Sequence, residues 1–147
     1  MAETHLHFVE LDENNVVKRG IVVGKDVPTA DGPLGDNPKH VDGETYCHDL
    51  LGGTWKQTFK DHSFRKQYAG KGFTYNAAKD IFIEVQHYAS WTLDENDDWQ
   101  SPVPYPTDTT EKSIGWDEAG QKWIAGGLQE PFTEYEWDPS GLTWVAI

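Results

Sequence analysis

The chain contains WDPSGLTW at residues 137–144, a tryptophan on each side of a short run of turn-forming residues. The side chain of Asp138 can accept backbone N–H bonds, the next residue is a proline that fixes φ, and Gly141 suits the left-handed conformation that ends a bulged hairpin loop. The stretch therefore predicts a β-hairpin in which Trp137 and Trp144 are neighbours on the two strands. Aromatic pairs across two strands contribute roughly 0.2–1 kcal/mol each.

The same unit recurs at residues 116–123, which read WDEAGQKW. Trp116, Asp117, Gly120 and Trp123 take the places of their counterparts in the C-terminal copy, and Asp117 and Asp138 are 21 residues apart. This repeat predicts a second hairpin with Trp116 and Trp123 as its aromatic pair.

Three further copies are looser. YNAAKDIF begins at Tyr75, pairs it with Phe82, opens its turn with Asn76 and has Lys79 in place of the glycine. LDENNVV and LDENDDW begin at Leu11 and Leu93, and the second ends at Trp99. Five hairpins are therefore predicted, and their turns open at Asp12, Asn76, Asp94, Asp117 and Asp138.

Composition favours sheets with an aromatic core. Of the 147 residues, 37% are hydrophobic and 13% aromatic, so Trp, Tyr and Phe must supply much of the buried surface. Cys47 is the one cysteine, which excludes an intramolecular disulfide. The first residues lack the pattern of a signal peptide, and no run of 18 apolar residues occurs, so we expect a soluble protein without membrane association.

The predicted fold is all-β, built of consecutive antiparallel hairpins in a meander or sandwich-like arrangement. Residues 24–43 contain three prolines and four glycines, which predicts a long irregular loop. A short helical turn is expected around Asp49 to Leu51. SPVPYP, with alternating prolines at residues 102–106, predicts a stiff connector between a β-rich body at 1–101 and a C-terminal hairpin appendage at 107–147.

The net charge of −13 is unevenly spread along the chain. Residues 56–83 carry +4, residues 84–147 carry −11, and residues 1–55 carry −6. So acidic a chain is not expected to bind nucleic acid, which needs a basic surface. The basic strip is either a solvated face or a docking patch for another protein or a second copy. Five residues form this candidate docking patch: Lys56, Lys60, Arg65, Lys66 and Lys71.

Residues that could carry chemistry are few. His5 and His7 would share one face of a strand, a spacing that metal sites use, but the sequence offers no third ligand. Cys47, His48 and Asp49 are neighbours in sequence, whereas a catalytic set of these types is assembled from separate elements. We predict no catalytic residue, no metal site and no cofactor.

The sequence of one acidic turn matches the first half of a calcium-binding loop. Asp94, Asn96 and Asp98 match its first positions. Trp99 stands at the sixth position, which needs glycine, and Tyr105 at the twelfth, which needs glutamate. The stretch therefore does not predict a calcium site.

Several motifs follow one another in the chain: YCHDLLGGTWKQT, RKQYAGKGFTYNAAKDIFI, SWTLDENDDWQSPVPYP and the two Trp-to-Trp hairpins. In this order they resemble a family of small virion structural or accessory proteins of marine tailed bacteriophages, including cyanophages and pelagiphages. The similarity runs from about Gly43 to Ile147. In the SW-x-LDE turn, this chain has Asp97 and Asp98 before Trp99, one residue fewer than is common in the family. The resemblance implies no catalytic residues.

The resemblance implies a non-enzymatic protein that is assembled in the host cytoplasm and located in the virion. Its expected partners are other phage structural proteins of the capsid or tail, and it is expected in multiple copies or as a homo-oligomer. A capsid decoration (cement) protein or a tail-associated subunit fits best. Two alternatives remain: a tail or fibre module that binds host glycans through exposed tryptophans, and a chaperone of tail-fibre assembly.

Overall fold

The computed structural model describes residues 5–29, 32–34 and 40–147. The chain divides into two compact units, Met1–Val85 and Gln86–Ile147. Strands dominate both units, and α1 (His40–Leu51) is the one helix among the described residues, so the predicted all-β class is confirmed. No helix in the described ranges is long and apolar enough to cross a membrane.

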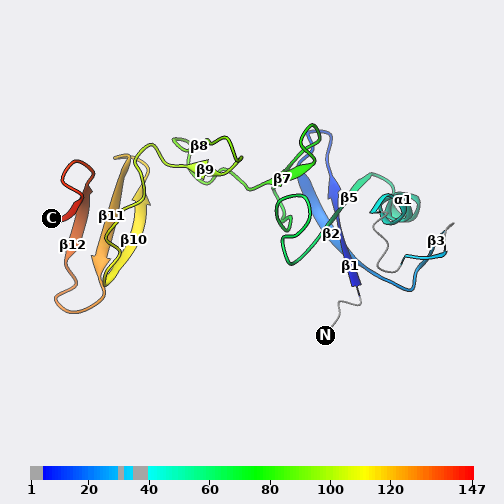
Figure 1. Cartoon of the computed structure of the whole chain (residues 1–147), viewed down its shortest axis with the longest axis horizontal. Helices are drawn as coiled ribbons and strands as arrows, with labels where there is room; N and C mark the ends of the chain where they lie inside the picture. The colour runs from blue at the N-terminus through cyan, green and yellow to red at the C-terminus, as the bar shows by residue number, and fades with distance from the viewer. Residues whose placement is uncertain (1–4, 30–31, 35–39) are drawn as a thin grey trace. The chain divides into compact units, whose positions relative to one another are not determined.

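A three-stranded antiparallel sheet forms the centre of the N-terminal unit, with β1 between its two neighbours (Figure 1). Its strands, in chain order, are β1 (His5–Leu11), β2 (Val17–Gly24) and β5 (Thr54–Thr58). Successive side chains of a strand point to opposite faces. Because other parts of the unit cover both faces of β1, all residues from His7 to Leu11 are buried.

Each face of β1 contributes to its own hydrophobic cluster. Phe8 packs with Cys47 of α1 and with Trp55 of β5, so the helix covers this face. Val9 and Leu11 belong to the other cluster, which is closed by Ala69 and by a short hairpin. That hairpin consists of β6 (Thr74–Asn76) and β7 (Ile81–Ile83).

The segment predicted as an irregular loop is more ordered than expected. It contains a small antiparallel hairpin, β3 (Pro28–Thr29) with β4 (Gly32–Pro33), and its last residues begin helix α1 at His40. Residues 30–31 and 35–39 of the predicted loop lie outside the described residues.

Helix α1 has twelve residues, whereas the sequence predicted only a helical turn near its end. A glycine and several polar residues hide its helical pattern. Gly43 is required by packing, because a Cβ there would overlap the ring of Phe8. The helix ends where Gly52 and Gly53 adopt left-handed φ values of 71° and 83°, and Gly52 N donates to His48 O at 2.7 Å.

The C-terminal unit is a four-stranded antiparallel meander in the order β10-β11-β12-β13, preceded by one short hairpin (Figure 1). The hairpin is formed by β8 (Thr92–Leu93) and β9 (Trp99–Gln100). The strands of the meander are β10 (Lys112–Asp117), β11 (Lys122–Gly127), β12 (Glu134–Asp138) and β13 (Thr143–Ala146).

The division into units differs from the expected one. The prolines of residues 102–106 were expected to connect two parts of the chain, but they lie inside the C-terminal unit. Pro106 is buried, and Val103 packs against the buried tryptophans of the meander. This segment is therefore held by tertiary contacts and is not an exposed spacer.

All five turn-opening residues lie where a turn joins two paired strands. Asp12 and Asp94 directly follow the first strand of their hairpin, and Asn76, Asp117 and Asp138 are its last residues. Three aromatic pairs are direct partners in the register: Tyr75 with Phe82, Trp116 with Trp123, and Trp137 with Trp144. The spacing of seven residues within each pair places both rings on the same face of their hairpin.

The glycines of the two Trp-to-Trp turns serve a different purpose from the predicted one. The left-handed φ falls on the following residue, Gln121 (50°) in one turn and Leu142 (53°) in the other. A Cβ at Gly141 would lie 2.8 Å from Asp138 Oδ2, and the earlier turn has the same close approach. Glycine is thus needed to make room for the aspartate carboxylate.

The two LDEN turns share one conformation. In each, Oδ1 of the first aspartate, Asp12 or Asp94, accepts the N–H groups of the second and fourth residues after it at 2.8–3.0 Å. The left-handed residue is Asn15 (61°) in one and Asp97 (60°) in the other. The shorter SW-x-LDE turn, between β8 and β9, therefore has the same conformation as the turn that joins β1 to β2.

Candidate functional site

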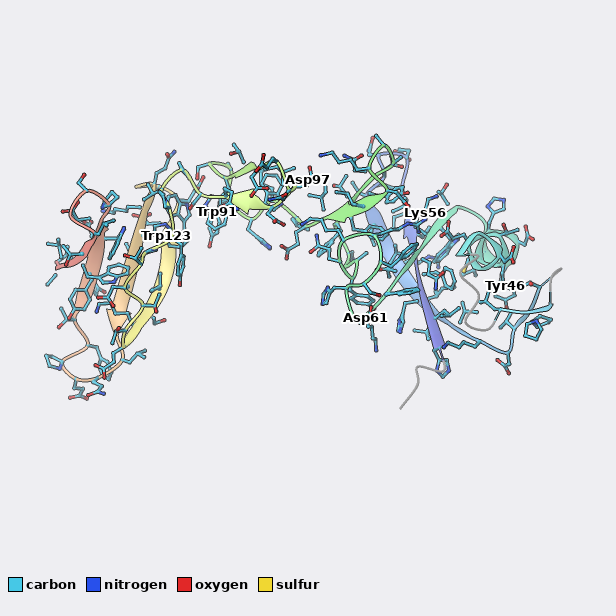
Figure 2. All side chains as sticks on the ribbon, in the orientation of Figure 1. Tyr46, Lys56, Asp61, Trp91, Asp97 and Trp123 are labelled. Carbon is cyan, nitrogen blue, oxygen red and sulfur yellow. The ribbon has the colours of Figure 1, made fainter. Side chains whose placement is uncertain are left out.

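The tryptophans of the meander form the core of the C-terminal unit. Trp116, Trp123 and Trp137 are buried and lie on one face of the sheet. Residues 86–108 are hereafter called the strap, and its residues Tyr88, Trp91 and Val103 pack against this face. Trp91 of the strap contacts Trp116 and Trp123 with ring centroids 6.1 and 5.9 Å apart (Figure 2).

Hydrogen bonds from indole N–H groups hold the strap in place. Trp123 Nε1 donates to Val103 O at 2.9 Å, and Trp144 Nε1 donates to Asp108 O at 2.7 Å. Buried indole N–H groups need such acceptors, because an unpaired one costs about 1–3 kcal/mol. Trp123 and Trp144 thus use their indole N–H groups as well as their rings within the unit.

Glu118 fastens the beginning of the strap, a role that the sequence did not predict. Its carboxylate accepts Trp116 Nε1 at 2.8 Å, Ser90 N at 2.8 Å and Ser90 Oγ at 2.7 Å. The hydrogen bond from Trp116, followed by those from Ser90, lowers the pKa of Glu118 below its ordinary value. The sequence shows a glutamate directly after Trp116-Asp117, but it does not identify the partner, because Ser90 is 28 residues away in sequence.

The ring geometry does not form a flat platform for a sugar. The pairs within the tryptophan core meet at interplanar angles of 63–79°, as expected for edge-to-face packing. Trp99 and Trp144 are half-buried. Stacking on a glycan would need at least two exposed and coplanar rings. Three of the five tryptophans at the predicted hairpins, Trp116, Trp123 and Trp137, are buried, so the five do not supply such a pair.

The opposite face of the same sheet is open. Strand alternation places Ile124, Val145 and Ile147 on this face, and they are 37, 50 and 67% exposed. Gly115 and Gly126 lie on the same face, and a Cβ at either would meet nothing within 4 Å. We call this surface the open face; it combines exposed aliphatic side chains with bare backbone.

A hollow of about 340 Å³ lies on the open face across β10, β11 and β12. The two glycines form part of its floor, and larger side chains stand around it. Six of its lining residues are Ser113, Gly115, Ile124, Gly126, Glu134 and Ile147. Glu134 supplies the one side-chain carboxylate of the lining.

The two lysines of the C-terminal unit both interact with groups other than the lining carboxylate Glu134. Residues 86–147 contain twelve acidic residues and two lysines, a net charge of −10. Lys122 pairs with Glu136, whose hydrogen bond raises the pKa of the lysine. Lys112 donates to Thr110 O at 3.3 Å and lies 5.0 Å from the ring centroid of Tyr135. Within this fully described unit, no cation pairs with Glu134.

The prediction that Arg65 belongs to a surface docking patch is wrong, because Arg65 is buried with 7% of its surface exposed. Its Nε donates to Asp80 Oδ1 at 2.7 Å, and one terminal nitrogen donates to Glu44 Oε2 and Gln57 O, both at 3.0 Å. Asp80 also accepts the hydroxyl of Tyr75. Arg65 therefore joins α1, β5 and the β6–β7 turn from inside the unit.

The other residues of the patch are more accessible. Lys56 Nζ lies 3.6 Å from Glu44 Oε1 and 5.3 Å from the ring centroid of Tyr75, so it belongs to the edge of the Arg65 network (Figure 2). Lys60 and Lys71 are exposed, and Lys66 is half-buried. The structure thus separates the strip into an internal part and a surface part.

Cys47 and the two N-terminal histidines do not form a site with each other. Burial, and then the charge of Glu44, raise the pKa of the Cys47 thiol to about 11, so it is neutral near pH 7. His5 is exposed and His7 is buried in the sheet. Among the residues that the structure describes, no three His, Cys, Asp or Glu side chains gather as metal ligands would.

Compared with models of protein families, with curated proteins and with solved structures, the chain shows no match. The resemblance to marine phage proteins therefore stays a prediction.

Proposed function

We propose that this protein is a non-enzymatic structural component of a phage virion, a capsid decoration or tail-associated subunit that binds other virion proteins. The observation that carries the proposal is the contrast between the two faces of the C-terminal sheet. One face is packed by tryptophans under the strap, and the open face presents aliphatic side chains to solvent. Exposed apolar surface of this kind is typical of protein interfaces.

The high ionic strength around a marine virion favours binding through an apolar face such as this one. At high ionic strength, charges on the surface are screened within a few ångströms (about 3 Å at 1 M salt). Binding must then depend on shape and apolar contact more than on long-range attraction. A tryptophan-cored meander offers a rigid surface for such contact, and its net charge of −10 opposes association with nucleic acid.

The glycan-binding alternative gains no support from the packed rings of the C-terminal unit. An assembly chaperone would use an open apolar face as well, but it would be absent from the finished particle. The presence of the protein in purified virions therefore separates the proposed function from this second alternative.

The test is to purify virions of the parent phage, separate heads from tails, and quantify the protein in each fraction by mass spectrometry. Many copies in the head fraction would support a decoration protein, and a small number in the tail fraction would support a tail-associated subunit. If the protein is found in neither fraction, the proposed function is wrong.

A further inference from the structure

We propose that the hollow of the open face is an anchor site for an arginine side chain of the partner protein. The inference rests on the proposed function in one respect, since it assumes a protein partner. It adds the chemistry that the partner must present: a guanidinium group on a long aliphatic stem.

The shape of the hollow fits a long side chain better than a flat surface. Its floor is bare at Gly115 and Gly126, where a Cβ would meet nothing within 4 Å. Ile124 and Ile147 stand beside this floor with exposed aliphatic surface. A partner residue that enters must therefore supply apolar surface along its length.

The charge of the hollow selects a cation at the tip of that side chain. Glu134 is the carboxylate of the lining, and both lysines of the unit are engaged with other groups. Elsewhere on the open face, strand alternation places Asp117, Glu136 and Asp138, of which Glu136 is already paired with a lysine. A second copy of the same face would bring like charges together, so a cationic partner is favoured.

Arginine meets both requirements at once. Its stem can cover the isoleucines while the planar guanidinium pairs with a carboxylate through two hydrogen bonds. Guanidinium is also less strongly hydrated than the ammonium group of lysine, which makes it suitable for a site with apolar walls. Arginines in pockets near the centre of an interface often dominate its binding energy.

The first experiment measures binding of the peptide acetyl-Gly-Arg-Gly-amide to the full-length, ¹⁵N-labelled protein by NMR. We expect shifts of the amide signals of Gly115, Gly126 and Ile124. A peptide with citrulline in place of arginine keeps the shape and loses the charge, and it should bind about two- to fivefold more weakly, the range for a partly solvated ion pair.

Two variants test the hollow itself. Gly126→Val fills the floor and should abolish the shifts at Gly115, while Glu134→Gln should reduce the affinity for the arginine peptide to that for the citrulline peptide. Glu136→Gln is the matched control: it removes a carboxylate from the same strand and face, two residues away, outside the lining of the hollow. It should bind the arginine peptide as the wild type does.

Three results would overturn the anchor site: equal binding of arginine and citrulline peptides, shifts that survive in Gly126→Val, or tighter binding of a lysine peptide. Signals of the hollow that change with protein concentration when no peptide is present would mean that a second copy occupies it, which also contradicts the proposal. NMR spectra of each variant establish that it is folded.

Copy number in virions then distinguishes the anchor site from the proposed function. If wild-type protein is present in particles and Gly126→Val and Glu134→Gln lower its copy number relative to Glu136→Gln, both proposals are supported. Unchanged incorporation of these variants would contradict the anchor site alone. Absence of wild-type protein from particles would contradict the virion role, and the peptide titration would still decide whether the hollow binds arginine.

Discussion

Replacement of Arg65 by methionine should destabilise the N-terminal unit and leave the C-terminal unit unchanged. Arg65 is buried, and its guanidinium joins Glu44 and Asp80 at 3.0 and 2.7 Å. Methionine keeps the stem of the side chain but removes the charge. Loss of one partner of a buried ion pair costs about 3–5 kcal/mol, because the remaining charge is left without compensation.

The lower end of that range applies here. Asp80 is about half exposed and can be rehydrated, and Glu44 keeps the N–H of Gln57 at 3.0 Å and Lys56 at 3.6 Å. We therefore expect a loss of about 3 kcal/mol in the free energy of unfolding. For a unit of this size the total is about 4–13 kcal/mol, so the variant should fold but with little reserve. At a urea dependence of about 1 kcal/mol per molar, its midpoint should fall by about 3 M.

The two units must be followed separately, because a chain with two units need not unfold in one step. Incorporation of 5-fluorotryptophan gives seven ¹⁹F signals, of which Trp55 belongs to the N-terminal unit and the other six to the C-terminal unit. In Arg65→Met, only the signal of Trp55 should change its unfolding midpoint. Lys60→Met removes an exposed charge five residues earlier in the chain and should change the free energy of unfolding by less than about 0.5 kcal/mol.

A shift for Arg65→Met no larger than that for Lys60→Met would refute the reasoning, since the buried network would then contribute nothing to stability. An equal shift of all seven signals would show instead that the two units unfold together. Glu44→Gln, measured alone and with Arg65→Met, gives the coupling between the two residues, which should fall between 0.5 and about 3 kcal/mol for residues in direct contact.

Three further predictions concern single residues. Gly141→Ala should destabilise the C-terminal unit by about 1 kcal/mol in urea unfolding because its Cβ would crowd Asp138, whereas Ser140→Ala should have little effect; equal effects would contradict this role of the glycine. The Cys47 thiol, with its pKa raised to about 11, should react with iodoacetamide at pH 8 only after denaturation, and rapid labelling of the folded protein would show that it is accessible. Burial and the hydrogen bond to Asp80 raise the pKa of Tyr75 to about 12 from its ordinary value of 10.0, so the unfolded chain loses this proton first and stability should fall between pH 10 and 12; Tyr75→Phe should lessen that fall, and an unchanged pH dependence would contradict the assignment.

Local spacing predicted the hairpins well because each depends on neighbours in sequence. An aspartate or asparagine at the start of a turn bonds to N–H groups a few residues away, and paired aromatics need only a fixed separation along the chain. The sequence also identified the two glycines of the Trp-to-Trp turns. It assigned them the wrong cause, because the close approach of the Asp138 carboxylate to Gly141 appears only when the turn is built.

Helix α1 was largely missed because its stability comes from contacts rather than from its own composition. Gly43 weakens helical propensity, yet it permits the helix to lie against Phe8, which is distant in sequence. The boundary between the units was misplaced for a similar reason: the proline-rich segment has the composition of a spacer, but Val103 accepts the indole N–H of Trp123.

The sequence by itself determined the all-β class, the five hairpins and the aromatic pairs, since these follow from backbone preferences and alternation over a few residues. Tertiary structure decided which charged residues are surface and which are interior, as Arg65 shows most clearly. It also decided which face of the C-terminal sheet stays open. Alternation gives a strand two faces, but only the strap, packed over Trp116 and Trp123 by contacts distant in sequence, determines that the other face is left to solvent.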